Sequence, residues 1–446
     1  MFRAAFLALV PLLASAEVAV PPLEFGQRTL DNGLRVIWLE DHAAPVVAIQ
    51  VWYHVGSKDD PAGRSGFAHL FEHMMFKATK RMPSETIDRL TEDVGGENNA
   101  FTADDVTVYH ETVPSHHLER LLWAEAERMS SLTVDDANFK TERDVVKEEF
   151  RQSVLSQPFG EFYEFIPKQS FAAHPYKRPT IGNIAELDAA SLDEVRAFHA
   201  AFYRPDNATL VVAGDFDPAQ LQRWIDRYFA PLEKPSAPLP RVSTKEPSRT
   251  AGRTVRKFDA KVPFPALAVT FLGPKITDAE YAAWLVLERI LSGGEASRLN
   301  RSLVYEKRLA QEAEFYADLR EDLGCPTFVA MLASGVGVDK ARTALLAEID
   351  ALAAEPVSAR ELATAKNQVL AARLHDREKA EGKADALGFA AVLQGDAARV
   401  NTDLAEVQKV TAEKVQALAR KYFTGENRLM IEYLPASMRP KAKAKK

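Results

Sequence analysis

An internal repeat constrains the fold of this chain more than any other feature of its 446 residues. Residues 191–213 can be laid over residues 411–433, a shift of 220 positions, without a gap. In this alignment Asn207 falls on Asn427, directly before an apolar segment. Each copy begins with Ser or Thr, which suits a helix N-cap, and continues with a helical pattern and an apolar strand. The repeat predicts two domains of like fold.

Two earlier pairs of segments support the repeat at a similar shift. The apolar strand pattern of residues 46–53 matches residues 267–272. The helical pattern of residues 139–151 matches residues 362–374. Each half is therefore expected to combine strands with helices.

Composition along the chain indicates where the domains begin and end. Residues 1–16 contain Arg3, a short apolar run and small residues at the end, the pattern of a cleaved export signal. Five prolines between residues 230 and 250 predict an extended linker. We therefore expect an export signal at 1–16, a mature chain from Glu17, a first domain at 17–229, a linker at 230–250, a second domain at 251–436 and a basic tail at 437–446.

Charge and cysteine content exclude several classes of protein. The chain has 56 Lys and Arg against 63 Asp and Glu, a net charge of −7, which does not favour a nucleic-acid partner. No apolar run after the export signal is long enough to span a membrane. The single cysteine, Cys325, forbids an internal disulfide and lies too far from the cleavage point to anchor a lipid. We expect a periplasmic or secreted protein.

The segment His69-Leu70-Phe71-Glu72-His73 carries the strongest chemical signal. Residues four apart on a helix share a face, so the two imidazoles can hold one metal ion. Glu72 can take a proton from water that the metal activates. Catalytic zinc sites use three protein ligands, so a third is expected elsewhere. An ordinary amphipathic helix is the alternative, and the rarity of histidine, 10 in the chain, argues against it.

With this motif the chain resembles the inverzincin zinc peptidases, the family that includes pitrilysin, insulysin and the mitochondrial processing peptidase. The resemblance covers nearly the whole mature chain. It rests on four segments in order: Gly66 to Met74 (GFAHLFEHM), Gly95 to Thr102 (GGENNAFT), Glu142 to Glu149 (ERDVVKEE) and Tyr203 to Asn207 (YRPDN).

The resemblance implies a fold and an activity. The fold would be α+β, with two homologous domains, each a mainly antiparallel sheet with packed helices, that form a clamshell chamber. The activity would be that of a zinc metalloendopeptidase that hydrolyses peptides or unfolded polypeptides. His69 and His73 would be ligands of one zinc ion per chain, and Glu72 would be the general base.

The resemblance also implies that the third ligand is a glutamate on a distant helix. Glu142, Glu148 and Glu149 are the candidates. In the family a second acidic residue lies two helical turns before the ligand, and Glu142 has that separation from Glu149. We expect Glu149 to bind the metal, Glu142 to orient the site and Glu148 to lie on the surface.

Residues 99–109 read as a strand that the acidic turn Asp104-Asp105 interrupts. In the family the matching strand is an open sheet edge, onto which the substrate adds as an extra strand. The resemblance therefore assigns substrate contacts to Asn99, Ala100 and Phe101. The alternative is an ordinary core strand, in which the Phe101 side chain is buried.

The second copy of the repeat has lost the metal site. His375 is the only histidine after residue 250, so a second His pair is not possible there. Aligned with the first copy, Ala365 and Ala372 fall where the two spaced glutamates stand.

In the family the metal-free half contributes an Arg and a Tyr that hold the substrate and its developing oxyanion. This chain has Val304 and Gln311 in those places. The family includes heterodimers in which a homologous metal-free subunit supplies the Arg and Tyr, and we expect this chain to be the zinc-bearing subunit of such a pair. The alternative is that Tyr305 or Arg308 has taken over the role.

Two other classes of function remain open. One is a non-catalytic scaffold or assembly subunit of the same family, against which the intact His69, Glu72, His73 and Glu149 argue. The other is a periplasmic zinc-binding protein with two similar lobes, in which Glu72 would have no role.

Overall fold

The computed structural model describes residues 20–440, so the expected export signal and residues 441–446 lie outside the described part. Within it the strands form two sheets, one in each half of the chain. The first sheet contains β1 Gly26–Thr29, β2 Arg35–Glu40, β3 Val46–Tyr53, β4 Glu97–Thr102, β5 Thr107–Pro114 and β6 Ala208–Gly214. The second contains β7 Arg253–Asp259, β8 Ala266–Thr270, β9 Ala310–Tyr316, β10 Thr327–Leu332 and β11 Leu429–Pro435.

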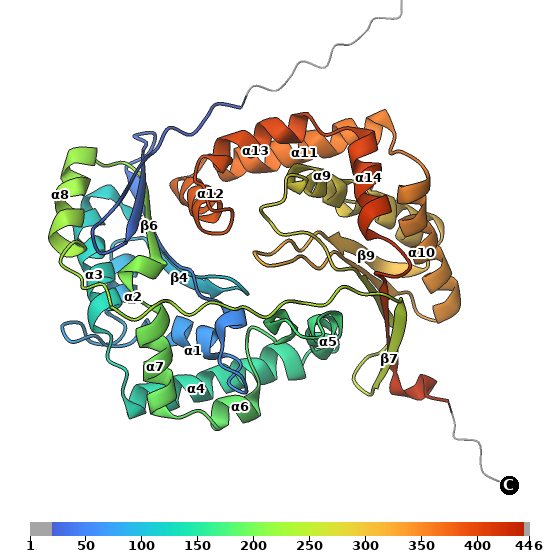
Figure 1. Cartoon of the computed structure of the whole chain (residues 1–446), viewed down its shortest axis with the longest axis horizontal. Helices are drawn as coiled ribbons and strands as arrows, with labels where there is room; N and C mark the ends of the chain where they lie inside the picture. Colours follow the sequence, from blue (N-terminus) through green and yellow to red (C-terminus); the bar gives the residue numbers. More distant parts are fainter. Residues whose placement is uncertain (1–19, 441–446) are drawn as a thin grey trace, which may run out of the picture.

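Both sheets are mainly antiparallel. The strand order is β1-β2-β6-β3-β5-β4 in the first sheet and β7-β11-β8-β10-β9 in the second. Each has one parallel pair, β2 with β6 and β7 with β11. The expected α+β architecture of two homologous domains is confirmed, and Figure 1 shows the domains facing each other as the halves of a clamshell.

The single interrupted strand predicted at residues 99–109 is wrong in one respect. The segment folds back on itself as the β4–β5 hairpin, in which Ala100 lies opposite Tyr109. The backbone N–H of Ala103 donates to the carbonyl of Val106 at 2.8 Å and closes the turn. The acidic pair is thus the tip of a hairpin, and β4 is left at the edge of the first sheet.

Helices cover the sheets of both halves. The first half contains α1 Phe67–Met74, α2 Thr86–Glu92, α3 Leu118–Ser131, α4 Asp136–Phe150, α5 Gly160–Ser170, α6 Ile184–Asp188, α7 Leu192–Phe202 and α8 Pro218–Tyr228. The second contains α9 Tyr281–Ser292, α10 Val338–Ala354, α11 Ala359–Asp376, α12 Ala380–Val392, α13 Arg399–Gln408 and α14 Ala412–Tyr422. Between residues 20 and 440, no helix combines the length and apolarity needed to cross a bilayer.

Each half has its own apolar core between its sheet and its helices. In the first half α1, α3, α7 and α8 pack on one face of the sheet. In the second half α9, α10, α11 and α14 do so. A short π-helical segment follows a long helix in the first half, at Arg151–Leu155 directly after α4.

Each half also packs one of its helices against the sheet of the other half. Helix α12 of the second half packs on the other face of the first sheet, where Gly388 lies against Trp52. A Cβ at Gly388 would come within 2.2 Å of the indole ring, so only glycine allows this approach. Helix α5 of the first half packs on the second sheet, with the rings of Phe162 and Tyr433 5.3 Å apart. Figure 1 shows α12 beside β6, and α5 contacts β8 and β11 of the second sheet.

Residues 229–252, between α8 and β7, contain no helix or strand. This segment is nevertheless fixed to the body of the protein. The carboxylate of Glu246 accepts hydrogen bonds of 2.6–2.9 Å from the backbone N–H groups of residues 172–174. The guanidinium of Arg249 donates to the carbonyls of Ser170 and Thr270 at 2.7 and 2.8 Å. The segment therefore ties both halves together rather than acting as a loose tether.

Candidate metal centre

Helix α1 presents one buried and one polar side. Its buried side chains are Phe67, Ala68, Leu70, Phe71 and Met74. The helix starts at Gly66, whose φ of 94° favours glycine, and a Cβ there would lie 2.9 Å from the Cα of Gly182. The Asp60 carboxylate accepts hydrogen bonds from the backbone N–H of Gly66 at 2.7 Å and of Ala68 at 2.9 Å. These contacts satisfy free donors of the first turn and fix the helix in place.

The polar side of α1 meets α4, which brings the third predicted residue to the pair of histidines. A Glu149 carboxylate oxygen lies 3.7 Å from Nε2 of His69 and 3.4 Å from Nε2 of His73. The three donor atoms lie within 4.8 Å of one another. Atoms that bind one zinc ion tetrahedrally lie about 3.3 Å apart, so the three side chains are close to that geometry.

This donor set suits zinc. Two imidazole nitrogens and one carboxylate form the protein part of a catalytic zinc site, in which a fourth position remains open. Within residues 20–440, His69, His73 and Glu149 form the group of histidine and acidic side chains that could hold a metal ion. All three are partly exposed, so a metal ion can reach them.

Glu142 lies behind this group, one step further from solvent. Its side chain is only 5% exposed, and its carboxylate oxygens lie 3.7 Å from Nδ1 of His73 and 3.0 Å from Nζ of Lys77. This places a negative charge against the ring nitrogen of His73 that faces away from Glu149. Such a neighbour fixes the ring and its tautomer. Glu148, in contrast, is 55% exposed and pairs with Arg151 at 3.1 Å.

The surroundings move the pKa values of these groups in opposite directions. Burial, together with the nearby His73, lowers the pKa of His69 to about 4. Burial opposes the charge of His73 as well, but Glu142 and Glu149 outweigh it and raise the pKa of His73 to about 9. The contact with His73 lowers the pKa of the Glu149 carboxyl. The pocket therefore favours the ionised form of the Glu149 carboxyl.

Glu72 occupies the same side of α1 but has a different environment. Burial raises the pKa of its carboxyl, so it retains a proton more readily than an exposed glutamate. One carboxylate oxygen accepts a hydrogen bond of 2.6 Å from Oγ1 of Thr102 on β4. A carboxyl group with a raised pKa and a fixed position suits proton transfer near neutral pH.

The three predicted substrate residues lie on β4 but do not share one face of the sheet. Ala100 and Thr102 face α1, and Ala100 packs against the first core. Asn99 and Phe101 face the other way, and the Phe101 ring meets Trp52 edge to face at 6.1 Å. Phe101 is 40% exposed, which excludes the core role considered for it.

Val304 and Gln311, which stand where the resemblance leads us to expect an Arg and a Tyr, have defined positions in the second half. Val304 lies in a π-helical segment, Asn300–Glu306, and Gln311 lies on β9. The Gln311 amide donates to the carbonyl of Leu332 at 3.0 Å, a contact within its own sheet. Tyr305 beside them is 54% exposed.

Sequence reasoning missed two side chains that touch this site, Thr102 and Lys77. The period of two along β4 could have placed Thr102 on the same face as Ala100, toward α1. Lys77 follows His73 by four positions, but α1 ends at Met74, so helical spacing does not place it. Its use became visible only with its ion pair to Glu142.

Comparisons with known proteins identify the family of the chain. Residues 35–183 match the model of insulinase, peptidase family M16, and residues 189–369 match the model of the peptidase M16 inactive domain. The protein named zinc protease PqqE of Helicobacter pylori is 31% identical over 287 residues, which make up 64% of this chain and 65% of that protein. This chain thus spans slightly less than two thirds of that relative.

Two further relatives extend the match over nearly the whole chain. The probable beta subunit of the mitochondrial-processing peptidase of Arabidopsis thaliana is 24% identical, covering 92% of this chain and 78% of that protein. The crystal structure of a protease from Helicobacter pylori superposes with a TM-score of 0.89 at 26% identity, covering 92% of this chain and 100% of that one. With the two family models on consecutive segments, these matches establish that the chain belongs to the M16 family of peptidases.

Proposed function

We propose that this protein is an exported zinc metalloendopeptidase that hydrolyses peptides or unfolded polypeptides. The observation that carries the proposal is the convergence of His69, His73 and Glu149 beside Glu72. The names of relatives, which include zinc proteases, support the same class of reaction. The export pattern of residues 1–16 supports a periplasmic or secreted location.

In this proposal His69, His73 and Glu149 hold the zinc ion, and Glu142 orients His73. Zinc bound there supplies a Lewis acid that lowers the pKa of water to about 7. Glu72 removes a proton from the attacking water and later gives a proton to the departing amine. Its raised pKa and its hydrogen bond to Thr102 suit both steps.

The substrate would bind as an added strand on β4. This strand pairs with β5 on one side only, so its other edge is available for backbone hydrogen bonds. Binding through backbone groups makes few demands on the substrate sequence. Asn99, Ala100 and Phe101 would line the bound peptide from both faces.

The oxyanion of the reaction needs a further donor, because Val304 and Gln311 offer neither an Arg nor a Tyr. We propose that a homologous metal-free subunit supplies both. An absent oxyanion donor costs a factor of about 10² to 10³ in rate, so the chain alone would be weakly active.

The test is hydrolysis of a mixed peptide library by the mature, zinc-loaded chain, with the Glu72→Gln variant as the blank. The proposal predicts cleavage that the variant loses while it keeps its zinc. It also predicts that the rate rises when the homologous subunit that co-purifies with the chain is added. Equal cleavage by both forms would contradict the role of Glu72, and full activity of the chain alone would contradict the paired subunit.

A non-catalytic scaffold of the same family is the second candidate. The match of residues 189–369 to an inactive-domain model favours it. This candidate predicts no hydrolysis with or without a partner, and assembly that does not change in Glu72→Gln. A periplasmic zinc-binding protein would likewise be unaffected by Glu72→Gln but would release zinc reversibly.

A further inference from the structure

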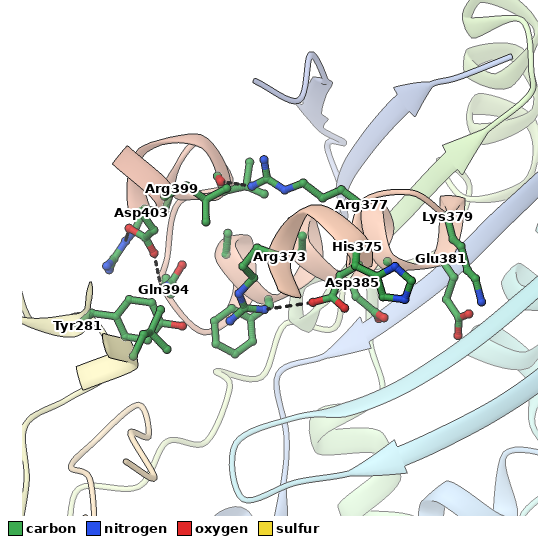
Figure 2. Close-up of a pocket in the computed structure, with 18 of the residues that line it drawn as sticks. Tyr281, Arg373, His375, Arg377, Lys379, Glu381, Asp385, Gln394, Arg399 and Asp403 are labelled. Carbon is green, nitrogen blue, oxygen red and sulfur yellow. Dashed lines mark hydrogen bonds and ion pairs between the residues drawn. The ribbon is translucent and has the colours of Figure 1, made fainter. Parts of the chain in front are cut away.

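A cavity of about 610 Å³ lies between the two domains, beside the edge strand β4. Trp52 and Phe101 line it from the first domain. Helices α9, α11, α12 and α13 of the second domain form the rest of its wall (Figure 2). Its volume falls within the range of about 300 to 1,000 Å³ that is usual for ligand sites. The cavity is separate from the candidate metal centre, and His69, His73 and Glu149 do not line it.

The position of Phe101 relates this cavity to a peptide bound on β4. Successive side chains of a strand point to opposite faces of the sheet, and those of an added strand alternate in step with them. Thr102 points toward Glu72, whereas Phe101 points into the cavity. Every second side chain of an added peptide would therefore face the metal site, and the others would face the cavity.

One buried cation in the wall of the cavity has no counter-charge among residues 20–440. Arg377, at the end of α11, is only 9% exposed. Its guanidinium donates to the carbonyl of Val400, while its Nε and Nη1 atoms are buried without a hydrogen-bond partner. Figure 2 shows it reaching toward the start of α13. Burial and the nearby Arg373 lower the pKa of Arg377, as expected for a positive charge that lacks compensation.

The carboxylates around the cavity have other partners, and that of Asp385 is the neutral amide of Gln50. Their contacts are Asp385 with Gln50 at 2.8 Å, Glu381 with His110 at 3.4 Å, Asp403 with Arg399 at 3.2 Å and Asp376 with Arg373 at 4.0 Å. No carboxylate within residues 20–440 is recorded in contact with Arg377. A buried charge without a partner is costly, so this position favours a ligand that supplies the opposite charge.

We propose that this cavity binds a carboxylate of the peptide that lies on β4, with Arg377 as its counter-charge. The inference rests on the proposed peptidase function and adds a substrate class to it. Arg377 has two nitrogens without a partner, Nε and Nη1, which lie on different edges of the guanidinium. Each can donate one charge-assisted hydrogen bond to a carboxylate. The carboxylate can come from an acidic side chain or from the C-terminus of the peptide, since both present the same group.

The test measures binding of labelled peptides to the mature, zinc-loaded Glu72→Gln chain by fluorescence anisotropy. One series compares a neutral peptide with versions that carry Glu in place of Gln at single positions. A second series compares an amidated C-terminus with a free one. The proposal predicts that one carboxylate-bearing version binds on the order of ten-fold more tightly than its neutral partner. The series in which this occurs identifies the source of the carboxylate.

The variant Arg377→Gln should reduce that ratio of dissociation constants to about one. Arg360→Gln, which removes the same charge from the exposed start of α11, should leave the ratio as it is. Thermal unfolding of both variants checks that they fold. Should Arg377→Gln unfold, Arg377→Lys, which keeps the charge without the guanidinium donors, should give an intermediate ratio.

The proposal would be overturned if the chain with Arg377 intact bound the carboxylate-bearing and the neutral peptide of every pair equally. It would also be overturned if that chain bound no peptide. A ratio that persists in Arg377→Gln would overturn the role of Arg377. Hydrolysis of the same peptides by the chain with native Glu72 is measured in parallel. Carboxylate preference without hydrolysis would contradict only the peptidase function, and hydrolysis without preference would contradict only this inference.

Discussion

Helices α1 and α4 of the first domain pack together as α9 and α11 do in the second, but the two pairs carry opposite chemistry. The facing sides of α1 and α4 bring His69, His73 and Glu149 together. In α9 the buried side chains are apolar and include Trp284, and α11 contributes Ala365 to the same core. The helix pair is thus a scaffold that does not depend on the metal site.

The comparison of the two domains also shows that the candidate metal centre requires partners for a buried carboxylate. Glu142 is as buried in the first domain as Ala365 is in the second, at 4% and 1% exposure. A buried carboxylate needs partners, and Glu142 has both Lys77 and His73. The second domain has replaced such a network with close packing. One domain therefore concentrates charge where the other concentrates apolar contacts.

The largest effect should follow from removing the proposed third ligand in the first domain, Glu149. Glu149→Gln should weaken zinc binding more than 100-fold, because a lost ligand costs more than the roughly 10- to 100-fold of a lost outer neighbour. Zinc titration against a competing chelator measures this. Glu148→Gln, one position away on the exposed side, is the matched control and should bind zinc as the native chain does.

Helices α5 and α12, which pack on the sheet of the other domain, test whether both domains depend on these contacts for stability. Phe162→Ala on α5 should lower the free energy of unfolding by about 3–5 kcal/mol, and Leu387→Ala on α12 by about 2–5 kcal/mol, because both side chains are fully buried against the opposite sheet. Urea unfolding at pH 7 measures both. Val145→Ala, at a 45% exposed position, should stay within about 0.5 kcal/mol. A cost below about 1 kcal/mol for either buried site would show that the halves are held together elsewhere.

A smaller effect is expected from the residue that has no counterpart in the second domain. Glu142→Gln should weaken zinc binding about 10- to 100-fold, since it removes the charge that orients His73. The same chelator titration applies. Unchanged affinity would mean that Glu142 serves only its ion pair with Lys77.

The smallest effect concerns a charged contact between the halves. Lys58 of the first domain lies 2.5 Å from Glu321 of the second. Burial opposes ionisation of Glu321, but His54 and Lys58 lower its pKa to about 2. A lowered folded-state pKa stabilises the protein above the unfolded value of about 4.3, and this contribution is lost as the pH falls toward 2.

Glu321→Gln should therefore lower the free energy of unfolding at pH 7 by on the order of 1 kcal/mol, and the difference from the native chain should shrink toward pH 3. Unfolding curves at both values measure it. Glu306→Gln, at a 63% exposed position, is the control. A difference that stays constant with pH would contradict the ionised contact.

Much of the fold follows from local patterns in the sequence. The strand predicted at residues 46–53 coincides with β3, because its apolar run is bounded clearly at both ends. The helical pattern predicted from residue 139 belongs to α4, which begins earlier, at Asp136, because the Asp135 side chain caps its first turn. Helix α12 carries Ala and Gly on several sides, so its sequence does not reveal that it lies on the sheet of the other domain.

Local sequence patterns likewise predict some residues of the candidate site and not others. His69 and His73 are one helical turn apart, so their cooperation is a local property. Glu149 follows on another helix, and only the family resemblance selected it among three glutamates. Thr102 reaches Glu72 through the packing of β4 against α1, which no local pattern encodes. Contacts between distant segments are what the sequence alone leaves open.

The most direct test of the account is X-ray diffraction from crystals of the zinc-loaded chain, with anomalous data at the zinc absorption edge. The account predicts one strong peak in the first domain, bounded by His69, His73 and Glu149, and none in the second. A peak bounded by Glu148, a peak in the second domain or no peak between α1 and α4 would contradict it.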